Sequence, residues 1–158
     1  MPERLEPSSE FLKAVAAGDA PLSGGVFADA NLGELIEATR DEDRANRDWA
    51  TFLLALSDID TAAVRDALLH AARDDDEYVR AEAISGLAQR DHKLALPFVQ
   101  NALRAQTVAA PIFEAAERIG HPSLVEDLRL WARPSDDHYL DQLATDALAA
   151  CEAAKHSA

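Results

Sequence analysis

Five histidines are the residues of this chain most able to bind a metal or move a proton. They are far apart in the sequence: His70, His92, His121, His138 and His156. No two stand at the i, i+3 or i+4 spacing that places two imidazoles on one face of a helix. The sequence therefore predicts no metal site and no cofactor.

The single cysteine, Cys151, is the strongest potential nucleophile, but its surroundings are not those of a catalytic residue. It lies in an alanine-rich helical pattern, without a glycine-rich turn or a histidine motif beside it. Ser85 falls in the middle of a predicted helix. Gly24 and Gly25 lack the lysine and the preceding strand of a phosphate-binding loop. We therefore expect a protein that is not an enzyme.

A run of four acids, Asp74 to Glu77, could attract a cation. The acids are consecutive, however, and lack the spacing and the glycine of a calcium-binding loop. Acids also favour the positively charged start of a helix, and this is the preferred interpretation.

The chain as a whole is strongly acidic, with 29 acidic and 15 basic residues and a net charge of −14. Such a surface repels nucleic-acid phosphates and anionic lipid headgroups and attracts cationic partners. Charge that only maintains solubility is the alternative interpretation. No long apolar segment or signal-peptide pattern is present, and a lone cysteine cannot form an internal disulfide, so the expected location is cytoplasmic.

The elements that would position any site repeat every 33 residues. DEDRANRDWATFLLA, from Asp41, and DDDEYVRAEAISGLAQR, from Asp74, share acids in the opening turn, an arginine (Arg47 and Arg80), and apolar residues at helical spacing. A self-match at this offset is typical of a solenoid, in which each unit buries its apolar face against its neighbours.

The predicted fold is all-α, an α-α superhelix of about four helix pairs with an extra N-terminal helix. Residues 1–30 are expected to form an arm with a short helix, Glu10–Ala17, that packs on the solenoid. Residues 31–158 are expected to form the repeat domain, and its first helix is predicted over Leu32–Arg40 with Asn31 as N-cap. The repeats are predicted at about 31–57, 60–90, 93–120 and 122–154.

This pattern resembles the HEAT-repeat family, especially the short bacterial form of the phycobiliprotein lyases. The best match is DDEYVRAEAISGLA, in which Gly86 replaces a usual alanine. The resemblance implies an α-solenoid that holds other macromolecules. It also implies a structural ladder between repeats, made by Asp43, Arg47, Asp76 and Arg80. The third repeat lacks both groups, so the ladder should break there.

The second helix of the first repeat carries an extra aromatic stripe. Trp49, Phe52 and Leu56 follow one face, beside the usual core residues. One interpretation is that Phe11, Leu12, Val26 and Phe27 fold back and cover this stripe. The other is a partner-binding patch, because tryptophan is a frequent interface anchor.

In a HEAT-like stack the second helices line the concave face. The candidate partner-binding residues on that face are Trp49, Phe52, Glu82, Ser85, Glu114 and Glu117. The leading hypothesis is a small acidic adaptor or inhibitor that binds a basic protein partner and neither nucleic acid nor membrane. An immunity or antitoxin-like role is a specific form of it. The alternative is a bilin-lyase-like chaperone or lyase, implied by the resemblance alone.

Overall fold

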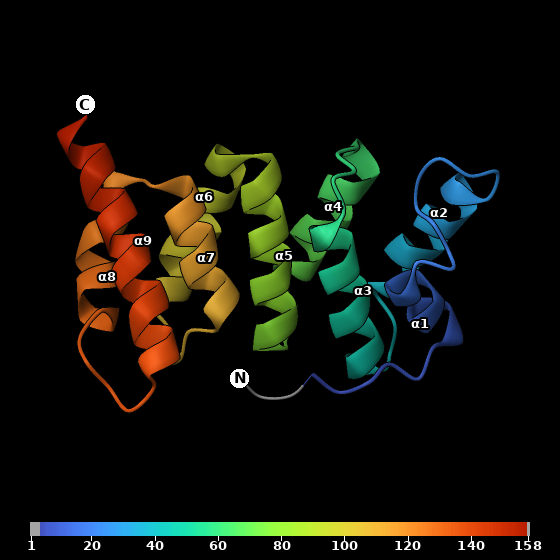
Figure 1. The fold of residues 1–158 in the computed structure, drawn as a ribbon, viewed down its shortest axis with the longest axis horizontal. Coiled ribbons are helices and arrows are strands. Elements are labelled where there is room, and N and C mark those ends of the chain that lie inside the picture. The colour runs from blue at the N-terminus through green and yellow to red at the C-terminus, as the bar shows by residue number, and fades with distance from the viewer. Residues whose placement is uncertain (1–3, 158) are drawn as a thin grey trace. The chain divides into compact units, whose positions relative to one another are not determined.

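The computed structural model describes residues 4–157; residues 1–3 and 158 of the predicted domain ranges lie outside the described part. Within it the regular structure consists of nine α-helices and one short 3-10 helix, with no strand (Figure 1). The all-α prediction is confirmed. The elements are α1 (Glu10–Ala17), α2 (Ala28–Ala38), α3 (Arg44–Leu56), α4 (Ala62–Ala71), α5 (Glu77–Arg90), α6 (His92–Leu103), α7 (Ala110–Ile119), η1 (Pro122–Leu124), α8 (Val125–Trp131) and α9 (His138–His156).

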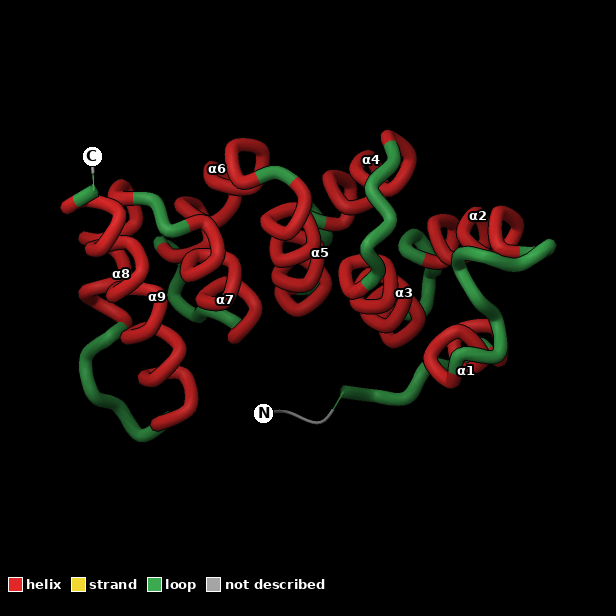
Figure 2. The backbone as a smooth tube through the Cα atoms, turned by 45° about the horizontal axis from the view of Figure 1, so that its top comes forward, coloured by secondary structure: helices red, strands yellow, loops and turns green. Residues whose placement is uncertain are grey.

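The chain divides into two compact units, and the division falls inside α5, between Gly86 and Leu87. In unit 1, α3 contacts α1, α2 and α4. In unit 2, α9 contacts α7, η1 and α8, while α6 contacts α7 and α8. Each unit thus shows the helix-on-helix packing of HEAT-type repeats. Figure 2 shows the loops that join successive helices.

The core of unit 1 lies where α3 meets its neighbours. Ala50 and Leu54 of α3 are fully buried, as is Leu68 of α4. Gly86 of α5 lies so close to α3 that a Cβ atom built on it would stand 2.7 Å from Cβ of Ala55. The glycine that departs from the family pattern therefore allows two helices to approach closely.

The core of unit 2 is built on α9, whose inward face consists of small residues. Ala144, Ala147 and Cys151 are fully buried. Phe113 of α7 is buried against Trp131 of α8, with 6.1 Å between their ring centroids in an edge-to-face arrangement. The small residues of α9 thus face larger side chains of the other helices, among them the aliphatic Leu124 and Leu128.

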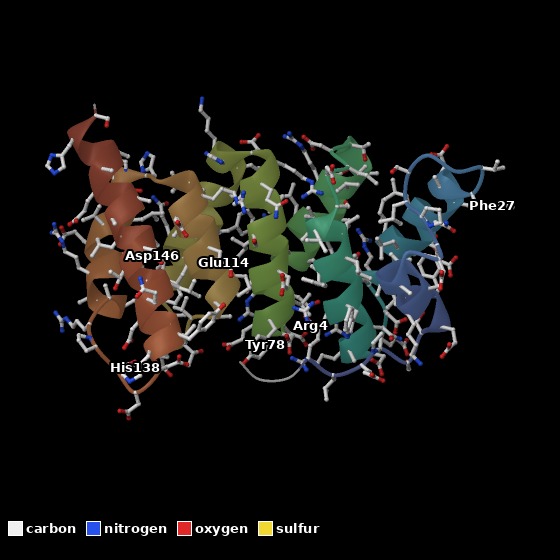
Figure 3. All side chains as sticks on the ribbon, in the orientation of Figure 1. Arg4, Phe27, Tyr78, Glu114, His138 and Asp146 are labelled. Atoms are coloured by element: carbon white, nitrogen blue, oxygen red, sulfur yellow. The ribbon has the colours of Figure 1, made fainter. Side chains whose placement is uncertain are left out.

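The N-terminal region differs from its prediction in two ways. Helix α2 begins at Ala28 with Phe27 as N-cap, because the Asn31 side chain donates to the carbonyl of Pro21 and does not cap a helix at Leu32. Val26 is 96% exposed and Phe27 is 73% exposed. Figure 3 shows Phe27 in the chain segment at α2. The interpretation in which Val26 and Phe27 cover the aromatic stripe is therefore wrong.

Candidate protein-binding site on unit 1

The acidic turns that precede α3 and α5 are built by the same hydrogen bonds, 33 residues apart. Asp43 accepts from the backbone N–H of Asn46, as Asp76 does from that of Val79. The side chain of Arg47 donates to the carbonyls of residues 41 and 42, and that of Arg80 donates to the carbonyls of residues 74 and 75. In each repeat the arginine therefore closes the turn that begins its own helix.

A second set of bonds joins the two turns. Nε of Arg47 lies 3.0 Å from Oδ2 of Asp74, and Nε of Arg44 lies 2.7 Å from Oδ2 of Asp76. Burial opposes ionisation of Asp74 and Asp76, but hydrogen bonds from these arginines and from backbone N–H groups outweigh it and lower the pKa of both carboxyls. The link between the repeats thus runs from Arg44 and Arg47 to Asp76 and Asp74.

The turns before α7 and α9, the second helices of the third and fourth repeats, are built differently. The N-cap of α7 is Ala109, which forms no side-chain capping bond. Before α9, Asp137 caps the helix through the N–H of Leu140, and Asp141 accepts from the backbone N–H and the hydroxyl of Ser135. An acid therefore closes this last turn, where arginines close the turns of the first two repeats.

The aromatic stripe of α3 is half-buried. Trp49 and Phe52 pack edge to face, with 5.9 Å between their ring centroids. Leu56, the third member of the stripe, is 62% exposed. The indole Nε1–H of Trp49 donates to the carbonyl oxygen of Leu5 at 2.7 Å. The segment that reaches this stripe is thus the short stretch before α1.

Arg4 provides most of that contact. Its guanidinium carbon lies 4.1 Å from the centroid of Phe52 and 5.6 Å from that of Trp49. Its Nη2 pairs with Oε1 of Glu82, and its Nε lies 3.4 Å from Oδ2 of Asp48. Figure 3 shows Arg4 between α3 and α5. A cation is therefore held between two aromatic rings and two carboxylates.

Asp48 is the most deeply buried acid of this cluster, at 5% exposure. Burial raises the pKa of its carboxyl, while the charges of Arg4 and Arg44 offset part of this shift. Its Oδ1 has no hydrogen-bond partner among the described residues, and neither has Nη1 of Arg4. The Arg4 guanidinium thus leaves one oxygen of Asp48 and one of its own nitrogens without a hydrogen bond.

The arm that carries Arg4 is anchored further along the chain. Pro7 is buried. The buried side chain of Asn46 accepts from the backbone N–H of Ser9 at 3.2 Å and donates to the hydroxyl of Ser8 at 3.1 Å. Figure 1 shows the chain that precedes α1 running past one end of α3. From here on, the arm means residues 4–9 alone, a shorter segment than the arm of residues 1–30 that the sequence predicts.

The structure distributes the predicted partner-binding residues over both units. Trp49, Phe52 and Glu82 meet around Arg4 in unit 1. Ser85, also in unit 1, is only 9% exposed, so little of its side chain can contact a partner. Glu114 and Glu117 are exposed on α7 of unit 2, as Figure 3 shows for Glu114. Partial desolvation raises the pKa of Glu114.

Sequence reasoning did not identify Arg4, Asp48 or Asp74 as parts of a site. Arg4 belongs to no periodic segment, so no pattern indicates which helix it contacts. Asp48 stands next to Trp49, and an acid beside the aromatic stripe was the only signal for it. Asp74 could have been found, since it opens the turn that Arg47 faces one repeat later.

The described residues contain neither a membrane-spanning helix nor a group of metal ligands. No helix among them is long and apolar enough to cross a membrane. No three or more His, Cys, Asp or Glu side chains of residues 4–157 are grouped as ligands of a metal ion.

Comparison with known proteins places the chain in a class. The family of HEAT repeats matches residues 32–117, more than half of the chain, so the protein belongs to the HEAT-repeat family. The chain is also similar to Protein YibA of Escherichia coli K12 and to its counterpart in strain O157:H7. Each is 32% identical over 119 residues, which cover 75% of this chain and 42% of the relative.

A solved structure shows the same likeness. The X-ray structure of E. coli YibA matches with a TM-score of 0.61 and 27% sequence identity, over 87% of this chain and 54% of that one. The chain spans less than half the length of the curated relatives it matches.

Proposed function

We propose that this protein is a non-catalytic adaptor or inhibitor that binds a basic protein partner through the face formed by α3 and the first part of α5. The observation that supports this most is the guanidinium of Arg4 held by Trp49, Phe52, Asp48 and Glu82. A surface with rings and carboxylates arranged in this way suits a cationic protein segment. The net charge of −14 would speed the encounter with such a partner.

An immunity or antitoxin-like role is the specific form of this proposal. A small acidic protein that masks a cationic toxin would use both the overall charge and the local site. A cytoplasmic location belongs to the same proposal. So does the lack of nucleic-acid and membrane partners, on the ground of charge repulsion.

The experiment is affinity capture with the purified 158-residue chain, followed by identification of the bound proteins. The wild type should retain a basic partner, and Trp49→Ala should lose at least about tenfold in affinity, since large aromatic anchors contribute 2 kcal/mol or more. Phe27→Ala is the matched control, because it removes an exposed aromatic ring of the same unit away from the site. Raised salt should slow association. Equal capture by Trp49→Ala and the wild type, or an acidic partner, would contradict the proposal.

The alternative is a bilin-lyase-like chaperone or lyase, which rests on the repeat resemblance alone. Co-expression with a bilin-synthesis pathway tests it directly, because bound bilin would colour the purified protein. A colourless preparation would favour the adaptor.

A further inference from the structure

We propose that Asp48, Trp49, Phe52 and Glu82 form an arginine-binding site, which Arg4 occupies in the free protein and an arginine side chain of the partner occupies in the complex. This inference rests on the proposed function and adds to it the residue type that the site recognises. It also makes the arm an internal competitor of the partner.

The geometry of the site selects a guanidinium over an ammonium. The planar group lies over the Phe52 ring at 4.1 Å, and its edges face carboxylates from two helices, Asp48 of α3 and Glu82 of α5. A lysine ammonium is a compact point charge on a single nitrogen. It has no flat face to lay on a ring and no second nitrogen to direct to a separate acid. We define the four residues Asp48, Trp49, Phe52 and Glu82 as the arginine site.

Arg4 fits this site incompletely. Nη1 of Arg4 and Oδ1 of Asp48 are both buried without a hydrogen-bond partner among the described residues. The Asp48 residue as a whole is only 5% exposed. A buried polar atom without a partner costs free energy, so the occupied state retains an unfavourable contribution. A guanidinium that enters at a slightly different angle, from another chain, can remove it.

The arm can release Arg4 without losing its own attachment. Pro7 is buried and Ser9 is bonded to Asn46, so the anchor lies after residue 6. Before the anchor, Leu5 is 62% exposed and Glu6 is exposed, and the hydrogen bond from Trp49 to the carbonyl oxygen of Leu5 adds to the contacts of Arg4. Because lifting residues 4–6 breaks only the contacts of this short segment and leaves the helices of unit 1 packed, this opening requires less free energy than unfolding of unit 1.

The tether determines how strongly the arm competes. A group held by a short link has an effective concentration on the order of millimolar near its site. The apparent affinity for an external arginine is reduced by the fraction of molecules in which the site is open. Removal of Arg4 should therefore strengthen binding in trans.

The test uses the 158-residue chain and a blocked peptide with the sequence RLEPSS of residues 4–9. Two further peptides carry lysine or alanine in place of the arginine. Binding is followed by NMR through the indole N–H signal of Trp49, and that of Trp131 serves as an internal reference on unit 2. We expect Arg4→Ala to bind RLEPSS about tenfold more tightly than the wild type. The alanine peptide should bind at least about tenfold more weakly than RLEPSS, and the lysine peptide should lie between them.

The matched control is Arg129→Ala, which removes an exposed arginine paired with Glu126 and Glu152 in unit 2. It should bind the peptide as the wild type does. Circular dichroism checks that Arg4→Ala is folded, and Arg4→Gln, which keeps the aliphatic stem, is the second variant. Adding Glu82→Gln to Arg4→Ala should abolish the gain in affinity.

Two results would overturn the inference: equal affinity of Arg4→Ala and the wild type for RLEPSS, or equal affinity of Arg4→Ala for the arginine and alanine peptides. Two further outcomes distinguish failure of this inference from failure of the proposed function. If the peptide shows no preference for arginine while Trp49 is still needed to capture a basic partner, only the arginine site is wrong. If the peptide binds as expected but no basic partner is captured, the adaptor role is wrong.

Discussion

The thiol of Cys151 is fully buried on α9, with its Sγ 3.6 Å from the carbonyl oxygen of Ala116 on α7. Burial raises the pKa of this thiol, and a hydrogen bond from the backbone of His121 offsets the shift only in part. The thiolate is the reactive form of cysteine. We therefore expect the native protein to resist labelling by a thiol reagent at pH 7 and to react fully in denaturant. Rapid stoichiometric labelling of the folded protein would contradict this.

Leu87 is fully buried, whereas Leu130 of α8 is 58% exposed. Leu87→Ala should lower the free energy of unfolding by about 2–5 kcal/mol, because it removes buried apolar contacts and leaves a cavity. Leu130→Ala should change it by less than about 0.5 kcal/mol. Urea titrations of the two variants provide the comparison, and similar midpoints for both would show that Leu87 is not a core residue.

At this scale the sequence predicted the residues that follow a helical period and missed those that do not. Leu54 and Leu87 are buried, as their shared position in the repeat indicated. Arg4 and Asp48 could not be placed in the same way. The position of Arg4 depends on the path of a non-periodic segment. Asp48 is buried and pairs with Arg4, a residue distant in sequence, so no local pattern indicates its partner.

Among the elements, α1 has the predicted bounds, because it combines a helical period with a clear capping residue, Ser9. Helix α2 begins earlier than predicted, since Asn31 is used in a loop bond to Pro21. The apolar pattern thus predicts that a helix is present. The residue at which the helix starts also depends on whether the expected capping side chain caps it or bonds to another part of the chain.

The close approach of α3 and α5 makes a specific prediction for Gly86. Alanine is favoured over glycine in a helix by about 1 kcal/mol. At Gly86, however, the added methyl group would stand 2.7 Å from Cβ and 3.0 Å from Cα of Ala55. We expect Gly86→Ala to lower the free energy of unfolding by about 1–3 kcal/mol, as overpacking does.

The matched control is Gly33→Ala in α2. A Cβ at Gly33 meets nothing within 4 Å, so this variant should be stabilised by up to about 1 kcal/mol. Thermal melts of the two variants measure both effects. A stabilised Gly86→Ala would show that α3 and α5 are not in close contact.

The ladder between the first two repeats predicts a dependence on pH. The pKa of Asp74 and that of Asp76 are lowered from the ordinary value of 3.8, because bonds from Arg47 and Arg44 outweigh the effect of burial. An acid with a lowered pKa in the folded state binds fewer protons there than in the unfolded state. Its stabilisation is therefore present above pH 3.8 and is lost as the pH falls through the lower, folded-state value.

Arg47→Gln should destabilise the protein by about 1–3 kcal/mol at pH 7, the range for hydrogen bonds to charged groups. The difference from the wild type should shrink below pH 3.8. Arg129→Gln, which breaks exposed pairs, should have almost no effect at either pH. Chemical denaturation at several pH values measures both. A difference for Arg47→Gln that is independent of pH would mean that Asp74 is not its main partner.

For the whole molecule, the contacts of α9 predict which part of the chain depends on it. Helix α9 contacts α7, η1 and α8, all within unit 2. In repeat proteins stability is close to a sum of local terms and nearest-neighbour terms. Deletion of residues 138–158 should therefore greatly reduce hydrogen-exchange protection of α7 and α8, while α3 and α4 keep theirs. Uniform loss of protection along the chain would contradict this.

The agreement of the two acidic turns, bond for bond at 33 residues, has a consequence for engineering. A duplicated segment 57–89, inserted after residue 89, would offer Arg80 to a new copy of Asp74, as Arg47 is offered now. It would also set Ala88, which corresponds to Ala55, against a new copy of Gly86. Only the Arg44–Asp76 pair would lack its arginine, because Glu77 stands at that position. The chain thus contains a module that can be copied to lengthen the protein, and Glu77→Arg in the original segment, before the inserted copy, would restore the missing pair.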